Sequence, residues 1–133
     1  MTIDGVKILN LPKVKDERGN LSFLQEGNLP FEIQDICWPY DAKNRMEGYA
    51  HKKLSEIIIA LSGSVEVIVQ DSENNKHAFN LNSPLDALYV PRSLWREMIN
   101  YSDDACLIHL LDGNLEEKSV IRNFKNYLNY VNA

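Results

Sequence analysis

The sequence predicts a single all-β domain closed by a C-terminal helix, and three observations lead to this prediction. Short runs rich in Val, Ile, Leu and aromatic residues follow one another along most of the chain. Clusters of Asp, Asn, Ser and Gly separate these runs about every ten residues, as in sandwiches and barrels. The last segment changes to apolar residues at helical spacing. With 133 residues, the chain is expected to form one domain spanning 1–133.

The strand predictions rest on apolar runs bounded by turn signals. The clearest is 64–70, where Val65, Val67 and Val69 alternate with more polar positions and therefore share one face of a strand. The polar clusters 16–20 and 71–76 are predicted turns. The complete set of predicted strands is 6–11, 21–25, 31–38, 57–61, 64–70, 77–81, 87–90, 97–101 and 105–111.

The predicted helix lies within residues 115–131. Val120, Phe124, Leu128 and Val131 recur there at a spacing of three or four residues, so they would form one apolar stripe facing the rest of the domain.

Composition excludes several classes of function. The net charge is −5 and the basic residues form no block longer than Lys52-Lys53, so nucleic acid is not an expected partner. No apolar run approaches the length of a membrane span, and the N-terminus lacks a signal-peptide pattern, so we expect a cytoplasmic protein with no membrane attachment. Cys37 and Cys106 lie in apolar, strand-like surroundings and are expected to be buried, reduced thiols.

Two segments resemble the two sequence blocks of the cupin class. The first cupin block has the form G-x5-H-x-H-x4-E-x6-G, and its H, H, E and G positions are occupied here by Tyr49, His51, Glu56 and Gly63. The second block, G-x5-P-x-G-x2-H-x3-N, fits residues 91–100 and places Arg96 at its histidine. The resemblance implies that the all-β domain is a cupin jelly-roll barrel with a short C-terminal helix.

The residues at these positions argue against a metal site. Tyr49 is a poor ligand because its phenol must first lose a proton, and Arg96 puts a permanent positive charge where the cation of a metal-binding cupin sits. We therefore expect no metal, and a pocket that presents a guanidinium, an imidazole and a phenol. Glu56, without a metal to bind, is expected to pair with a cation such as Arg96.

A closer resemblance extends over nearly the whole chain. The segments that carry it are 16-DERGNL-21, 29-LPFEI-33, 50-AHKKL-54, 61-LSGSVEV-67, 88-LYVPRSLWRE-97 and 121-IR-122. They resemble the sugar nucleotide 3,4-ketoisomerases, or WxcM-like cupins. The resemblance implies a metal-free and cofactor-free isomerase that moves the ketone of dTDP-4-keto-6-deoxyglucose from C4 to C3, on the way to amino-deoxysugars of surface glycans. It also implies a homodimer with exchanged N-terminal strands.

Moving a ketone between adjacent carbons proceeds through an enediol. The reaction therefore requires a base that removes a proton from carbon, an acid that gives a proton to oxygen, and a hydrogen-bond donor that stabilises the enediolate. Imidazole is well suited to the base role. By resemblance His51 is the expected base, and Tyr49 is a phenol that could supply the acid. The residues implied to contact the substrate are Arg18, Arg96, Lys53, Tyr89, Trp95 and Trp38.

Several positions depart from the family pattern. Met46 replaces an arginine, Tyr49 replaces a histidine, and a tyrosine pair of the family appears as Cys37-Trp38. Three functions therefore stay open: an isomerase with a rearranged acid or another keto-sugar substrate; a non-catalytic member that binds a nucleotide sugar or partners an active paralogue; and a cupin that binds an unrelated small acid. His77 is expected to be exposed, and His109 is expected to be a hydrogen-bonded interior residue.

Overall fold

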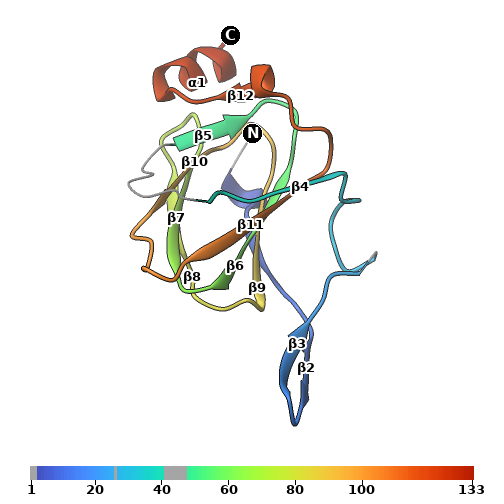
Figure 1. Ribbon diagram of the computed structural model, residues 1–133. Coiled ribbons are helices and arrows are strands. Elements are labelled where there is room, and N and C mark those ends of the chain that lie inside the picture. The colour runs from blue at the N-terminus through green and yellow to red at the C-terminus, as the bar shows by residue number, and fades with distance from the viewer. Residues whose placement is uncertain (1–2, 26, 41–47) are drawn as a thin grey trace.

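The computed structural model describes residues 3–25, 27–40 and 48–133, which form two antiparallel sheets packed face to face with a separate hairpin below them (Figure 1). Met46 and the rest of the polar stretch 41–47 lie outside the described residues. One sheet has the order β1-β9-β6-β11-β4 and the other β12-β5-β10-β7-β8. This arrangement confirms the all-β jelly-roll prediction. The strands are β1 Lys7–Asn10, β2 Lys13–Asp16, β3 Gly19–Ser22, β4 Asp35–Cys37, β5 Gly48–His51, β6 Glu56–Ser62, β7 Val65–Gln70, β8 Lys76–Leu81, β9 Asp86–Val90, β10 Trp95–Ile99, β11 Cys106–Leu111 and β12 Val120–Ile121.

The main core lies between the two sheets and follows from strand alternation. Along β7, Val65, Val67 and Val69 are buried, as the alternating pattern predicts, and they pack against residues of the opposite sheet such as Ile58 and Leu88. Successive side chains of a strand point to opposite faces, so each inward position alternates with an outward one. This rule also decides which polar side chains reach the interior.

The outer faces of both sheets are covered. On the sheet that contains β6, outward residues such as Ile57 and Ile59 pack against Leu24, Leu29 and Phe31 of the segment between β3 and β4. On the other sheet, Ala50 and Trp95 pack against the C-terminal helix α1 (Phe124–Val131), which lies over that end of the molecule (Figure 1). Strands of both sheets are therefore buried on two faces.

The C-terminal segment is where the helix prediction over 115–131 is partly wrong. Residues Glu117–Ser119 form a short 3-10 turn, η2, and Val120 and Ile121 pair with His51 and Ala50 as strand β12. The helix begins only after Asn123, whose side chain caps it by accepting a hydrogen bond from the backbone N–H of Asn126 at 3.1 Å. Open backbone groups at the edge of β5 account for the difference, because they bind this segment in extended form.

Other deviations from the predictions are local. The strands 13–16 and 48–51 were not predicted, and the strand expected at 97–101 runs instead over Trp95–Ile99. The turn at 16–20 is confirmed, since residues 16 and 19 end the paired strands of a hairpin. The expectation of two buried thiols is wrong for Cys106, which is exposed, and Cys37 is partly buried. Among the described residues, no helix is long and apolar enough to cross a membrane.

Candidate active site

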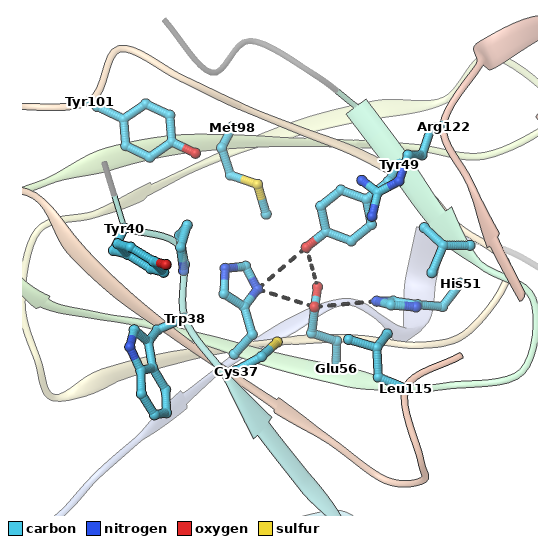
Figure 2. Close-up of a pocket in the computed structure, with 13 residues that line it drawn as sticks. Cys37, Trp38, Tyr40, Tyr49, His51, Glu56, Met98, Tyr101, Leu115 and Arg122 are labelled. Carbon is cyan, nitrogen blue, oxygen red and sulfur yellow. Dashed lines mark hydrogen bonds and ion pairs between the residues drawn. The ribbon is translucent and has the colours of Figure 1, made fainter. Parts of the chain in front are cut away.

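A cavity of about 320 Å³ opens between the sheets, and both sheets and the C-terminal segment contribute to its wall (Figure 2). Its polar wall contains Tyr49, His51, Glu56 and His109. The remaining lining residues are Cys37, Trp38, Pro39, Tyr40, Met98, Tyr101, Leu115, Val120 and Arg122. The cavity is the place where the cupin-block residues of the sequence meet.

Strand alternation brings the polar group together. Tyr49 and His51 are two residues apart on β5, so both point to the interior, while Ala50 between them packs outward against the helix. Glu56 begins β6, and His109 lies on the neighbouring strand β11. Four side chains from three strands therefore converge on one point inside the barrel.

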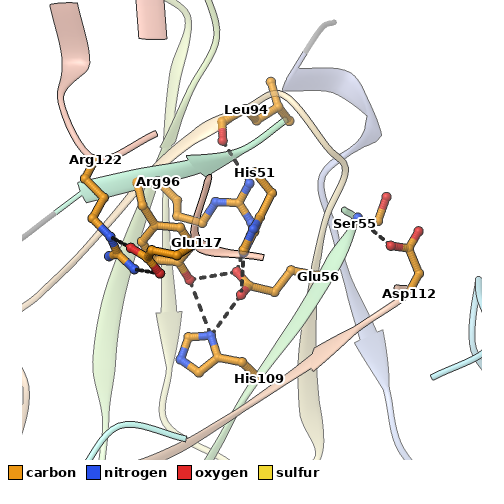
Figure 3. A network of polar contacts seen from close by, with 10 residues as sticks. His51, Ser55, Glu56, Leu94, Arg96, His109, Asp112, Glu117 and Arg122 are labelled. Carbon is orange, nitrogen blue, oxygen red and sulfur yellow. Dashed lines mark hydrogen bonds and ion pairs between the residues drawn. The ribbon is translucent and has the colours of Figure 1, made fainter. Parts of the chain in front are cut away.

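Glu56 is the centre of this group (Figure 3). Its Oε1 accepts hydrogen bonds from the Tyr49 hydroxyl at 2.8 Å and from Arg96 Nη1 at 2.9 Å. Its Oε2 lies 3.1 Å from His109 Nδ1 and 3.4 Å from His51 Nε2. An ionised carboxylate has about four acceptor sites, so it can accept from Tyr49, from Arg96 and from each imidazole in the tautomer that carries a proton on the facing nitrogen.

Burial and the neighbouring charges shift the pKa of Glu56 in opposite directions. Only 2% of the residue is exposed, and burial alone would raise the pKa of its carboxyl group. The charges of His109 and Arg96, with hydrogen bonds from His109 and His51, outweigh burial and hold this pKa well below its usual value. Glu56 is therefore an anion, and its environment favours donors around it.

The pKa of Tyr49 is shifted upward, in the direction opposite to that of Glu56. Burial first, and then the nearby Glu56 carboxylate, raise the pKa of its phenol well above the usual value, although the Arg96 charge opposes this. Its hydroxyl also lies 3.3 Å from His109 Nδ1. Tyr49 is therefore a protonated phenol that donates to Glu56.

Arg96 supports the group from beneath the cavity. It is 0% exposed, which confirms the predicted inward orientation, and its ion pair with Glu56 confirms the predicted pairing. Its Nη2 donates to the Leu94 carbonyl oxygen at 2.8 Å, and its guanidinium carbon lies 5.2 Å from the centre of the Tyr49 ring. Arg96 is not among the residues that line the cavity, so its direct contact is with Glu56.

The rim of the cavity is aromatic and basic. Trp38 and Tyr40 are exposed at 62% and 81% and follow β4, and Arg122 follows β12 (Figure 2). The Arg122 guanidinium makes a two-pronged ion pair with Glu117, in which Nη2 lies 3.0 Å from Oε2. A flat aromatic side chain and a guanidinium can contact a ring and an anionic group of a ligand.

Four other residues named from the sequence lie outside the cavity lining. Arg18 is at the tip of the β2–β3 hairpin, where its side chain is 91% exposed and pairs with Asp16. Lys53 lies in the bend after β5 and is exposed. Trp95 neighbours inward-pointing Arg96 on β10 and therefore points outward to the helix, and Tyr89 likewise packs on the outer face against Phe31.

His109 and Arg122 are pocket residues whose place the sequence did not predict. His109 was expected to be hydrogen bonded in the interior, which is confirmed, but it also lines the cavity. The alternation of the segment CLIHLL could have predicted this position, because Leu107 and His109 are two residues apart on one strand and therefore share its inward face. Within the described ranges, no group of three or more His, Cys, Asp and Glu side chains is arranged to hold a metal ion.

Comparison with known proteins identifies the family. The family model described as FdtA, WxcM-like, C-terminal, matches residues 4–132. The chain is 34% identical over 128 residues to a TDP-4-oxo-6-deoxy-alpha-D-glucose-3,4-oxoisomerase of Aneurinibacillus thermoaerophilus, covering 94% of this chain and 91% of that protein.

Solved structures agree with this match. The WlaRB TDP-quinovose 3,4-ketoisomerase of Campylobacter jejuni superposes with a TM-score of 0.86 at 35% identity, covering 96% of this chain and 99% of that one. A mutant of the 3,4-ketoisomerase QdtA from Thermoanaerobacterium thermosaccharolyticum, in complex with TDP-4-keto-6-deoxyglucose, has a TM-score of 0.86 at 25% identity, covering 98% and 95%. The chain belongs to the WxcM-like family that includes these sugar 3,4-ketoisomerases.

Proposed function

We propose that this protein is an isomerase that moves the ketone of a dTDP-linked 4-keto-6-deoxyhexose from C4 to C3 through an enediol, in the biosynthesis of deoxyamino sugars. The observation that carries the proposal is the near full-length match to a TDP-4-oxo-6-deoxyglucose 3,4-oxoisomerase. A cavity that holds an imidazole and a phenol around one carboxylate supplies the acid–base groups that this reaction needs.

The proposed chemistry uses His51 as the carbon base. His51 removes the proton from C3 with Nε2, in the tautomer whose Nε2 carries no proton, the electron pair of the C–H bond forms the C3–C4 double bond, and the carbonyl oxygen at C4 becomes a hydroxyl. Tyr49 lies beside His51, with ring centres 5.3 Å apart, and its phenol is the proposed hydrogen-bond donor to the developing oxyanion, a role in which its proton turns from Glu56 to the substrate. The reverse sequence at the other carbon gives the 3-keto sugar without a metal or another cofactor.

Among the predicted substrate contacts, Trp38 has the position that best fits binding. It lies exposed at the rim, where its ring can stack on the thymine base or the sugar. Arg96 acts in this proposal through Glu56. Lys53, Tyr89 and Trp95 lie outside the cavity lining, so their predicted contacts require a substrate that extends beyond it.

We also propose a homodimer with exchanged N-terminal strands. Within the single chain, β1 pairs with its own β9, and the β2–β3 hairpin projects away from the barrel with Val14 and Leu21 exposed at 48% and 61% (Figure 1). A second copy would cover these apolar side chains, and exchange would offer Arg18 a route to the other copy's site. The proposed location is the cytoplasm, where free thiols such as Cys37 persist.

The alternative is a member of the family that binds a nucleotide sugar without turning it over, or that partners an active paralogue. Cys37 favours it, because this thiol lies in the cavity wall where the family pattern has a tyrosine. Burial and the nearby carboxylates of Glu56 and Asp35 raise the pKa of the Cys37 thiol, so it is a weaker acid than an ordinary cysteine.

One experiment separates these functions. The purified protein is mixed with dTDP-4-keto-6-deoxyglucose in D₂O, and NMR follows deuterium at C3 and formation of the 3-keto sugar. The isomerase gives both. Calorimetric binding of dTDP without exchange supports the binder, and neither binding nor exchange rejects both and leaves a cupin for an unrelated small acid.

A further inference from the structure

The two imidazoles that contact Glu56 differ in what their second nitrogen meets. His51 directs Nε2 toward the carboxylate, and its Nδ1 is enclosed without a hydrogen-bond partner in the described part of the chain. His109 directs Nδ1 toward the same oxygen, and its Nε2 is not among the enclosed, unpartnered atoms. Both rings line the cavity, so a ligand can meet His51 only at Nε2, beside Glu56, whereas it can meet His109 at Nε2, the nitrogen that Glu56 does not contact.

The position of His109 follows from strand pairing. It lies directly opposite Cys37 in the antiparallel pair of β11 and β4, so both side chains point to the cavity face of one sheet. In Figure 3 the ring places Nδ1 toward Glu56 and holds its other nitrogen on the far side of the ring. A carboxylate that fixes one imidazole nitrogen determines the orientation and the protonation state of the other.

Tyr49 and Cys37, which lie beside His109 in the cavity wall, are poorly suited to cycling a proton between two sugar oxygens. The Tyr49 proton is donated to Glu56, and the raised pKa of that phenol opposes its loss. The Cys37 thiol is also a weakened acid. The His109 ring, by contrast, has Nδ1 3.1 Å from Glu56 Oε2, which leaves Nε2 as the nitrogen that can give a proton to the substrate and take one back.

We propose that His109 is the acid–base residue that serves the two sugar oxygens, with Glu56 holding its Nδ1 and Nε2 acting in the cavity. This inference rests on the proposed isomerase function and deepens it, by assigning the acid that the sequence left open.

The imidazoles of His51 and His109 together account for every proton that the reaction moves. As His51 takes the C3 proton, the C4 carbonyl oxygen takes the proton from His109 Nε2, which leaves a neutral enediol, a protonated His51 and a neutral His109. His109 then takes the proton from the C3 hydroxyl, the C3 carbonyl forms, and C4 takes the proton from His51. Both histidines return to their starting states.

The test compares His109→Asn with the matched control His77→Asn, whose histidine is exposed on β8. Asparagine can keep a donor to Glu56 at the position of Nδ1, but it has no nitrogen at the position of Nε2. We expect kcat to fall on the order of 10²- to 10³-fold in His109→Asn while KM changes less than about threefold, with no loss in the control. Added imidazole should restore part of the activity of His109→Ala, since a free imidazole can occupy the vacated space.

A His109→Asn variant that keeps kcat within about threefold of the wild type overturns the proposal. So does a loss of activity accompanied by loss of dTDP binding and no imidazole rescue, because that pattern belongs to a structural role. Circular dichroism checks the fold, and His109→Ala, assayed with and without added imidazole, takes the place of His109→Asn if the asparagine variant does not fold. A wild-type protein that forms no 3-keto sugar rejects the isomerase function itself, whereas an active wild type with active variants rejects only the role of His109.

Discussion

Neutralising the Glu56 carboxylate should strongly destabilise the fold, because this buried group has four polar contacts. In Glu56→Gln the side chain keeps its shape, but Arg96 stays 0% exposed and loses its only anionic partner among the described contacts. Oε1 can still accept from Arg96 and Tyr49, whereas the amide NH₂ that replaces Oε2 faces the donors of His51 and His109. Leaving a buried charge uncompensated costs about 3–5 kcal/mol.

The assay is urea unfolding followed by intrinsic fluorescence at pH 7, with Glu73→Gln as the matched control. Glu73 is exposed in the turn after β7, so its replacement should change the free energy of unfolding by less than about 0.5 kcal/mol. A cost below about 1 kcal/mol for Glu56→Gln would refute the reasoning, because it would mean that the buried guanidinium does not depend on this carboxylate.

Three further outcomes follow from the same contacts. Because the folded state lowers the pKa of Glu56, the stability difference between wild type and Glu56→Gln should be complete above the unfolded pKa of about 4.3 and shrink as the pH falls further, which urea curves from pH 7 to 3 would measure. Tyr49→Phe should lower kcat on the order of 10²-fold in the NMR assay, with binding of dTDP retained, since Arg96 still holds Oε1; unchanged kcat would remove Tyr49 from the chemistry. Asn123→Ala should cost about 1 kcal/mol in thermal unfolding, because the N–H of Asn126 loses its cap, and a variant as stable as the wild type would show that the cap contributes nothing.

The fold was predictable because apolar alternation and turn residues act locally. The pattern of Val65, Val67 and Val69 determines which face of β7 is buried, whatever the rest of the chain does. The prediction failed where a distant partner decides the conformation. Val120 and Ile121 satisfy helical spacing, but the open edge of β5 holds them extended.

The site residues also divide into those that the sequence predicts and those that depend on how the strands are placed. His51, Tyr49, Glu56 and the inward Arg96 followed from block spacing. Trp95 could not share the cavity with Arg96, because adjacent residues of one strand point to opposite faces, and the structure puts Trp95 against Phe124.

His109 was the hardest residue to find from the sequence. A histidine within an apolar strand looks the same whether it fills the core or faces a ligand. Only the pairing of β11 with β4 and β6 shows that His109 lies opposite Cys37 and Ile58, on the face of the sheet that Glu56 shares with Ile58.

The C-terminal segment forms one wall of the cavity, through Leu115, Val120 and Arg122, and this wall can change in sequence independently of the strands that precede it. The backbone of His51 is clamped between Val120 of β12 and the N–H of Ser93, and the Ser93 carbonyl in turn accepts from the Tyr127 hydroxyl of the helix at 2.9 Å. Insertions or substitutions after residue 119 can therefore reshape the entrance at Arg122, or tilt the imidazole of His51, while the strands before β12 keep their register. Sugar preference can diverge in such a scaffold through the tail and its strand β12, with the other strands of the two sheets unchanged.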